Sequence, residues 1–317
     1  MTDKMSQINT INMRIPKVRG IIKKNFELSR LSWLKVGGPA EIFFQPEDED
    51  DLSFFLKNLE TNIPIFVIGA CSNLIIRDGG IPGVVIKLGK NFSTIKLNKT
   101  VVSVGAACRD SYLAQTCAKE GVDLSFLRTI PGNLGGAVKM NAGCYGSYLS
   151  DYLIGLTLIR RDGSIADMKA SDFKFSYRNS NIPDDAIITN VLLRKELDDP
   201  LSIEMKMTRA IDIRNLSQPT KDLSCGSTFR NPLGRSSLED KYDNDHSLKA
   251  WKLIDDAGLR GAKIGGAMVS KKHTNFLINT GNATAKDIED LGKFIIRKVK
   301  TNSGINLIWE VKRVGKY

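Results

Sequence analysis

A turn with the residue types of a phosphate-binding site follows a buried apolar stretch near the start of the chain. Residues 69–73 read GACSN, so successive backbone N–H groups are joined by the side chains of Ser72 and Asn73. Such a set of donors suits a diphosphate. A tight connection that binds nothing is the alternative, because the turn matches neither the G-x-G-x-x-G nor the G-x-x-x-x-G-K-[ST] pattern.

A second glycine-rich run covers residues 130–146, IPGNLGGAVKMNAGCYG. Its glycines leave room for a large flat ligand to approach the backbone and meet its amides. They are Gly132, Gly135, Gly136, Gly143 and Gly146. Two such runs around a β-rich region indicate a bound dinucleotide.

Three further polar residues, Arg178, Ser227 and Glu310, stand in otherwise structured stretches. Each alone also fits a structural role: Arg178 as a surface cation, Ser227 as a helix cap or turn residue, and Glu310 as a solvated strand residue. Nucleophilic hydrolysis fits poorly, since a G-x-S-x-G elbow around Ser227 would need glycine where the chain has Phe229.

Cysteine and histidine usage excludes several other kinds of site. A Cys225 nucleophile would need His246 or His273 beside it, and nothing in the sequence requires that. The five cysteines form no C-x-x-C pair, so we expect no metal site, no disulfide framework and a reducing compartment.

Hydrophobic periodicity predicts the elements that position these residues. Strands are expected over 41–45, 64–69, 84–88, 101–106 and 186–197, a hairpin over 153–168 that turns on Asp162-Gly163, and helices over 52–59, 111–119 and 200–215. A helix from Leu248 would bury Leu248, Trp251 and Ile254. Another opens with a capping box, Thr284-x-x-Asp287, and buries Ile288, Leu291, Ile295 and Val299. A closing strand over 305–314 would place Glu310 opposite Trp309.

Length and pattern predict two domains in the 317 residues. We expect an N-terminal extension over 1–30, a first domain of two α+β subdomains over 31–199, and a second domain over 200–317. The net charge of +11 comes from scattered lysines and arginines, so nucleic-acid binding is a disfavoured alternative. The N-terminus has no apolar signal-like stretch and no run is long enough to span a membrane, so we expect a cytoplasmic protein.

Seven motifs, in order, resemble the UDP-N-acetylenolpyruvoylglucosamine reductase family, flavoenzymes of bacterial cell-wall (peptidoglycan) precursor synthesis. The resemblance covers about residues 31–315. Its motifs are VGGPAE (36–41), GACSNLIIRDGG (69–80), the run over 130–146, FSYRNS (175–180), CGSTFRNP (225–232), GLRGAKIGGAMVSKKHTNFLIN (258–279) and WEV (309–311).

The resemblance implies an α+β fold, with an FAD-binding domain of the p-cresol methylhydroxylase/vanillyl-alcohol-oxidase type followed by a smaller α+β substrate-binding domain. It implies FAD as cofactor and NADPH as hydride donor. Matched motif by motif, the cofactor-binding residues are Gly69, Ser72, Asn73, Leu74, Pro131, Gly132, Gly135, Gly136, Asn141 and Gly143. The catalytic residues are Arg178, Ser227 and Glu310, and candidates for substrate contact are Asn231, Lys263 and Lys271.

In that family, NADPH reduces FAD, and hydride then reaches the methylene carbon of an enolpyruvyl ether. By resemblance, Arg178 and Glu310 would stabilise the resulting enolate, and Ser227 would protonate its carbon. The expected partners are this UDP-sugar substrate and NADPH, with a monomer and no nucleic acid or membrane. Another FAD oxidoreductase of the same fold, or a nucleotide-binding module, stays an alternative.

Two departures from the family pattern stand out. Ala70 and Cys71 replace glycines of the phosphate turn, so a positive φ there would be strained. The stretch between Arg178 and Ser227 is too short for the tyrosine-bearing loop of one subgroup, so the chain resembles the subgroup that lacks it.

Overall fold

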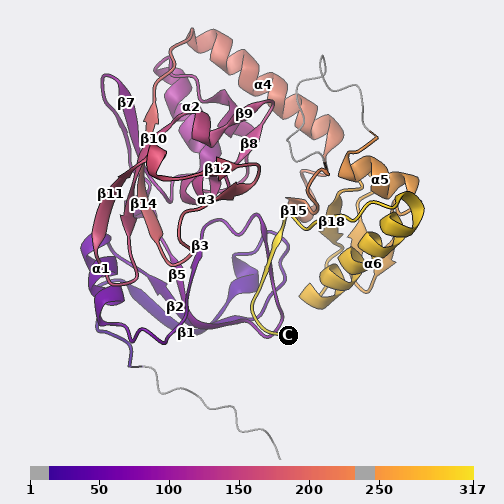
Figure 1. Ribbon diagram of the computed structural model, residues 1–317, viewed down its shortest axis with the longest axis horizontal. Helices are drawn as coiled ribbons and strands as arrows, with labels where there is room; N and C mark the ends of the chain where they lie inside the picture. Colours follow the sequence, from indigo (N-terminus) through magenta and orange to yellow (C-terminus); the bar gives the residue numbers. More distant parts are fainter. Residues whose placement is uncertain (1–13, 233–246) are drawn as a thin grey trace, which may run out of the picture.

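The computed structural model describes residues 14–232 and 247–317. In Figure 1, the N-terminal two thirds of the chain form one lobe and the orange and yellow C-terminal residues form a second. His246, considered above as a partner for Cys225, lies outside the described residues. Within those residues, no helix combines the length and apolarity that a membrane crossing requires.

A four-stranded sheet begins the first lobe, in the order β1-β2-β5-β3. Its strands are β1 (Ile21–Glu27), β2 (Pro39–Gln45), β5 (Ile81–Lys87) and β3 (Ile65–Ile68). The helix α1 (Glu49–Asn58) packs on it through Phe55, whose ring centroid lies 4.1 Å from that of Phe44. The prediction that the fold begins near Leu31 is wrong, because β1 pairs with β2 along its length.

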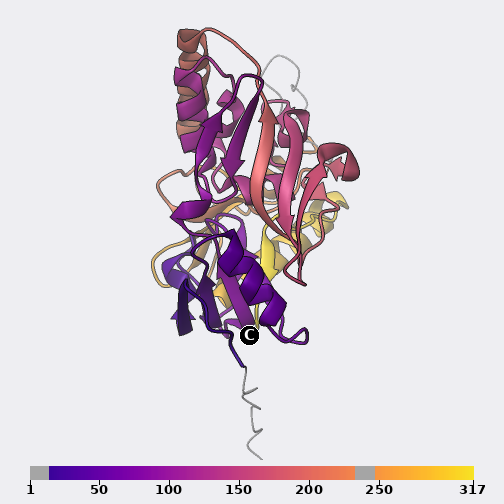
Figure 2. The ribbon, with the colours of Figure 1, turned by 90° about the vertical axis from the view of Figure 1, so that its left-hand side faces the viewer.

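A second, five-stranded sheet completes the first lobe and is entirely antiparallel, in the order β11-β10-β14-β7-β6. Figure 2 shows it above α1. Its strands are β6 (Ile95–Leu97), β7 (Val101–Gly105), β10 (Leu153–Ile159), β11 (Ile165–Lys169) and β14 (Ile187–Arg194). The predicted hairpin is confirmed, and its turn needs glycine because Gly163 has φ +82°.

Three helices and two short hairpins accompany this sheet. The helices are α2 (Asp110–Lys119), α3 (Leu134–Lys139) and α4 (Pro200–Ser217), and the hairpins pair β8 (Gly143–Cys144) with β9 (Ser147–Tyr148) and β12 (Phe175–Ser176) with β13 (Asn179–Ser180). Ile203 and Met207 of α4 are buried in the core of the first lobe. Packing therefore assigns α4 to that lobe, and a boundary near Pro200 comes too early.

The second lobe holds a four-stranded sheet in the order β15-β18-β17-β16, covered by two helices. These are β15 (Leu223–Ser227), β16 (Lys263–Ile264), β17 (Ala267–Val269), β18 (Phe276–Asn279), α5 (Ala250–Asp256) and α6 (Ala285–Ser303). The Thr284 capping box and the four-residue stripe of α6 are confirmed. The helix α5 starts two residues later than predicted. It buries Ala250, Leu253 and Ile254, whereas Leu248 and Trp251, which were expected to be buried, are only half-buried.

The end of the chain crosses back to the first lobe, visible in Figure 1 as the yellow segment that ends at the label C. There, β19 (Lys312–Val314) pairs in parallel with β4 (Leu74–Ile76). The predicted strand over 305–314 is wrong in its first part, where Trp309 makes only an isolated bridge to Phe229. Its indole packs so tightly against α6 that a Cβ added at Gly292 would lie 2.1 Å from the ring.

Candidate active site

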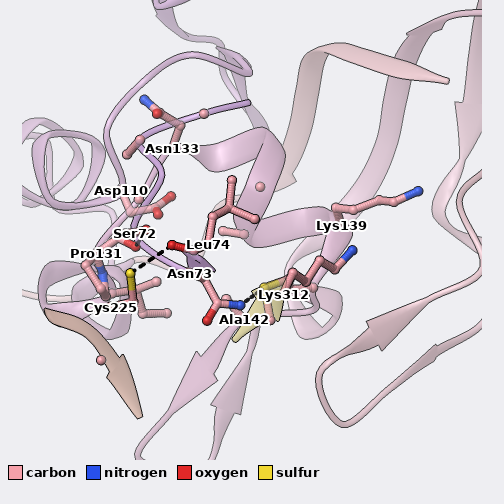
Figure 3. Close-up of a pocket in the computed structure, with 18 of the residues that line it drawn as sticks. Ser72, Asn73, Leu74, Asp110, Pro131, Asn133, Lys139, Ala142, Cys225 and Lys312 are labelled. Atoms are coloured by element: carbon pink, nitrogen blue, oxygen red, sulfur yellow. Dashed lines mark hydrogen bonds between the residues drawn. The ribbon is translucent and has the colours of Figure 1, made fainter. Parts of the chain in front are cut away.

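Residues of both lobes line a cavity of about 680 Å³. Part of it is shown in Figure 3, where Ser72, Asp110, Pro131, Cys225 and other side chains gather around the turn that follows β3. The first lobe contributes this turn, the run that contains α3, and the β12–β13 hairpin. The second lobe contributes the end of β15 and the segment that leads into β19. The cavity thus joins segments that the sequence keeps far apart.

Arg178 and Glu310 form an ion pair at the wall of this cavity. Arg178 Nε donates to Glu310 Oε1 at 2.8 Å, and Nη1 donates to the carbonyl oxygen of Gly143 at 3.1 Å. Arg178 occupies the tight turn of the β12–β13 hairpin with φ +54°, a conformation that costs energy for a residue other than glycine. Backbone strain of this kind concentrates at functional sites.

The surroundings of Arg178 favour its charged form. Burial alone lowers the pKa of Arg178, but the nearby Glu310 carboxylate and Tyr177 outweigh that effect and raise the pKa. The Arg178 guanidinium also lies 5.2 Å from the centre of the Tyr177 ring, and burial raises the pKa of Tyr177 to about 12. A permanent positive charge is therefore held at the cavity wall.

Ser227 lies at the end of β15, just after an irregularity in the pairing with β18. Gly226 has φ +77° and so redirects the chain, leaving Ser227 half-buried at the cavity. Among the described residues, no group forms a hydrogen bond with its Oγ. The hydroxyl is thus available to a bound molecule.

A network of hydrogen bonds holds Ser227 and Glu310 in place. The backbone N–H of Glu310 donates to the carbonyl of Thr228 at 2.8 Å, so the two catalytic candidates stand on adjoining segments. The buried amide of Asn275 fixes the next residue, since Phe229 N donates to Asn275 Oδ1 and Asn275 Nδ2 donates to Phe229 O, both at 2.9 Å. Asn275 was not identified from the sequence, although it lies within a quoted motif.

The turn after β3 contains one strained residue, and the hydroxyl of Ser72, expected as a donor to a diphosphate, instead donates to Pro131 O at 2.7 Å. Cys71 has φ +54°, and its side chain is buried in a hydrophobic cluster formed mainly by β2, β3, β4 and β5. The strain expected at the Ala70-Cys71 departure thus falls on Cys71 alone. In Figure 3, Cys225 of the second lobe reaches the same turn, and its Sγ donates to Leu74 O at 3.2 Å.

The second glycine run leaves open space where a cofactor would need it. A Cβ added at Gly136 would have no atom within 4 Å, whereas one at Gly135 would touch Ala106 at 3.0 Å. Gly136 therefore faces the cavity with bare backbone, and Gly135 allows α3 to pack closely on the adjacent backbone. These features fit a large planar ligand such as a flavin.

Most of the predicted site residues line this cavity. They are Gly69, Ser72, Asn73, Leu74, Pro131, Gly132, Gly135, Gly136, Gly143, Arg178, Ser227, Asn231 and Glu310. Asn231 also accepts a hydrogen bond from the backbone of Ala250 at 3.2 Å, at the start of α5.

Three predicted residues do not line the cavity. Asn141 instead accepts from Ser150 N and donates to Ser176 O, which anchors the hairpin that carries Arg178. Lys263 and Lys271 are exposed and lie outside the lining, so the geometry gives no support to their role in substrate binding.

Several lining residues were missed. Lys139 and Tyr177 lie within quoted motifs but were given no role there, and no motif marks Asp110, Arg214 and Lys312. Figure 3 shows the Lys139 and Lys312 side chains extending in the same direction. Lys139 is already engaged, since its Nζ donates to Ile182 O and forms an ion pair with Asp184 at 3.0 Å. Lys312 is therefore the better source of positive charge for an anionic ligand.

The other candidate nucleophiles are poorly suited to attack. Burial raises the pKa of the Cys225 thiol to about 12, which removes its reactive thiolate. Burial also lowers the pKa of His273 to about 4. A neutral, enclosed imidazole of this kind can accept a proton only weakly at pH 7.

Comparisons with known proteins agree with this geometry. Residues 40–169 match the family model "FAD binding domain", and residues 218–314 match "UDP-N-acetylenolpyruvoylglucosamine reductase, C-terminal domain". UDP-N-acetylenolpyruvoylglucosamine reductase of Paracoccus denitrificans is 50% identical over 302 residues, which cover 95% of this chain and 98% of that one. The enzyme of Ruegeria pomeroyi is 50% identical over 298 residues, 94% and 96% of the two chains.

A solved structure is also similar over nearly the full length. The crystal structure of UDP-N-acetylenolpyruvylglucosamine reductase from Thermus caldophilus superposes with a TM-score of 0.77 at 32% sequence identity. The match covers 94% of this chain and 99% of that chain.

Proposed function

The chain belongs to the UDP-N-acetylenolpyruvoylglucosamine reductase family, and from that premise we propose that the cavity between its lobes is the active site, with Arg178, Ser227 and Glu310 as catalytic residues. The chain is an FAD-dependent oxidoreductase that uses NADPH to reduce the enolpyruvyl double bond of UDP-N-acetylglucosamine enolpyruvate. The product is UDP-N-acetylmuramate, a peptidoglycan precursor. The first lobe has the FAD-binding fold of the p-cresol methylhydroxylase/vanillyl-alcohol-oxidase type.

FAD would lie along the two glycine-containing segments of the first lobe. The residues proposed to hold it are Gly69, Ser72, Asn73, Leu74, Pro131, Gly132, Gly135, Gly136 and Gly143. When bound there, FAD would supply the redox chemistry that links NADPH to reduction of the enolpyruvyl ether. The open backbone at Gly136 supports this placement, because it leaves the wall of the cavity free of side-chain atoms.

The Arg178–Glu310 pair would meet the enolpyruvyl carboxylate. Hydride addition at the methylene carbon places negative charge on the neighbouring carbon and its carboxylate. The Arg178 fork keeps Nη2 free of hydrogen bonds to the described residues, so it can donate to that carboxylate as charge builds. Glu310 holds the fork at the correct angle through the 2.8 Å bond to Nε.

Ser227 would supply the proton that completes the reduction. A hydroxyl is a weak acid, but an enolate carbon is a strong base, so no histidine partner is required. The observation that carries this role is the half-buried Oγ of Ser227 at the cavity, without a hydrogen-bond partner among the described residues.

The proposal also covers the substrate contacts, the domain boundary, the oligomeric state and the cellular location. Asn231 and Lys312 are the favoured contacts for the UDP-sugar, since both line the cavity, and Lys263 and Lys271 are retained only as candidates outside it. We place the FAD-binding domain before residue 218 and the substrate-binding domain after it. The protein would act as a cytoplasmic monomer without nucleic acid or membrane.

An absorption spectrum of the purified protein tests the function. Bound flavin should give a yellow protein that NADPH bleaches and the enolpyruvyl substrate restores. A yellow protein that NADPH bleaches but the substrate leaves bleached would indicate another oxidoreductase of this fold. A protein that NADPH cannot bleach would indicate a nucleotide-binding module.

A further inference from the structure

Asp110 is a buried carboxyl group with no partner in the fold. It begins α2, its side chain is 0% exposed, and neither carboxyl oxygen has a hydrogen-bond partner among the described residues. Burying an unpaired carboxyl costs free energy, and burial alone raises the pKa of Asp110 well above its usual range. The position is thus destabilising for the protein without a ligand.

This carboxyl lines the active-site cavity beside the first glycine of the second run. In Figure 3, Asp110 stands next to Ser72 and Pro131. The point that a Cβ on Gly132 would occupy lies 3.2 Å from Asp110 Oδ2 and 3.5 Å from Ser72 Oγ, and apart from Gly132 and its two chain neighbours no other residue has an atom within 4 Å. Two side-chain oxygens therefore border one small space that the glycine keeps empty.

The chemistry of these two oxygens defines what they can bind. Ser72 Oγ donates its hydrogen to the carbonyl of Pro131 at 2.7 Å, so towards the cavity it can only accept. The Asp110 carboxyl accepts in either protonation state and can also donate when neutral. A hydroxyl group satisfies both, whereas a phosphate oxygen would offer Ser72 no hydrogen and would be repelled by an ionised Asp110.

We propose that Asp110 is a cofactor-binding residue that hydrogen-bonds a sugar-type hydroxyl of FAD, in the space bordered by Ser72 Oγ and Gly132. The inference rests on the FAD site proposed above. The hydroxyl comes from the ribityl chain or from the ribose, which share the same chemistry. In this assignment the unpaired carboxyl is a binding group whose partner arrives with the cofactor.

Asp51 provides a matched control for this role. It is also an aspartate in the first turn of a helix, and it is 3% exposed. Unlike Asp110, it accepts hydrogen bonds from Arg19 N, Gly20 N and Glu47 N at 2.8–3.1 Å. Asp51 therefore has a structural role, and it lies outside the cavity lining.

The test compares FAD affinity with the stability of the FAD-free protein for the full chain. Asp110→Ala should weaken FAD binding by about 10- to 100-fold, while the thermal midpoint of the FAD-free protein stays level or rises. Asp110→Asn, which keeps an acceptor oxygen, should lose less affinity. Asp51→Ala should lower that midpoint and leave FAD affinity unchanged.

The inference is overturned if Asp110→Ala binds FAD like the wild type, or if its FAD-free form is destabilised like Asp51→Ala. A wild-type protein that binds no FAD would instead refute the proposed function. Titrations with FMN and ADP separate the two sources of the hydroxyl. A selective loss for FMN assigns the ribityl chain, and a selective loss for ADP assigns the ribose.

Discussion

Arg178 Nε lies 2.8 Å from Oε1 of Glu310, although 132 positions separate the two residues in the chain. The bond connects a hairpin of the first lobe to the segment that closes the second. Both side chains are largely buried, with exposed fractions of 17% and 11%. The contact between the lobes thus fixes Arg178 and Glu310 relative to each other.

Replacing Ser227 with alanine should separate the two half-reactions. Bleaching of the flavin by NADPH should persist, while recovery on adding the enolpyruvyl substrate should slow by about 10²- to 10⁴-fold, because the proton donor is gone. Stopped-flow absorbance of each half-reaction measures this. Ser224→Ala, on the same strand but outside the cavity lining, is the control and should leave both rates near wild type. Equal losses in both half-reactions for Ser227→Ala would reject the proton-donor role.

Replacing Arg178 with lysine should slow the substrate half-reaction, although the positive charge is kept. An ammonium group cannot bond Glu310, Gly143 O and a substrate carboxylate with the geometry of the planar fork. We expect the substrate half-reaction to fall by at least about 10²-fold. Glu310→Gln alone, and both changes together, complete a double-mutant cycle on kcat/KM. The coupling should amount to about 0.5–3 kcal/mol, and additive losses would show that the ion pair has no catalytic role.

The effect of a substitution at Cys71 on stability should depend on how well the new residue tolerates a positive φ. Cys71→Gly relieves a strained φ of +54° while removing a buried thiol, so the free energy of unfolding should change by less than about 1 kcal/mol. Cys71→Val should destabilise by about 1–3 kcal/mol and weaken FAD binding, because a β-branched residue tolerates that conformation poorly.

Urea unfolding and flavin titration measure both effects. Cys117, equally enclosed but in the helix α2, is the control. Cys117→Val should leave FAD affinity unchanged. If both valine variants behaved alike, the conformation of Cys71 would not be the cause.

Removing the charge of Glu289 should destabilise the protein in a pH-dependent way. Burial alone would raise the pKa of Glu289, but hydrogen bonds from Arg77 and Tyr317 outweigh it and lower the pKa. A lowered native pKa means that the ionised form stabilises the fold above the unfolded-state pKa of about 4.3, and that this contribution is lost as the pH falls through the native value. Glu289→Gln should therefore cost about 3 kcal/mol at pH 7, and this cost should stay level down to about pH 5 and shrink only below about pH 4.3.

Urea unfolding across that pH range checks the prediction. Asp290→Asn, on the next residue of α6, removes only exposed ion pairs with Lys286 and Lys293 and should cost less than about 0.5 kcal/mol. A cost for Glu289→Gln that did not shrink between about pH 5 and about pH 2 would contradict the assignment.

Local patterns in the sequence predicted most elements because their causes are local. The hairpin at Asp162-Gly163 and the capping box of Thr284 depend on neighbouring residues alone. The strand over 305–314 was overpredicted because Trp309 alternates correctly but packs against Gly292, a contact that no local pattern records.

Motifs in the sequence identified most residues of the site. Of the residues that were not predicted, some lie outside these motifs and reach the cavity only through the fold. Asp110 and Lys312 carry no motif of their own, and they reach the cavity because α2 and β19 begin beside it. Lys263 and Lys271 belong to the motif over 258–279, yet β16 and the loop after β17 place them outside the cavity lining.

The parallel pairing of β19 with β4 also constrains how the protein can be made. Arg77, just after β4, and Gly315, just after β19, are hydrogen-bonded across 238 positions of the chain. During synthesis, β4, which follows the turn at residues 69–73, is made long before its partner β19. Closing so long a loop is slow, and the edge of β4 stays unpaired meanwhile. The turn at residues 69–73 and Glu310 therefore come together only when β19 pairs with β4. The active site cannot be complete before that pairing forms.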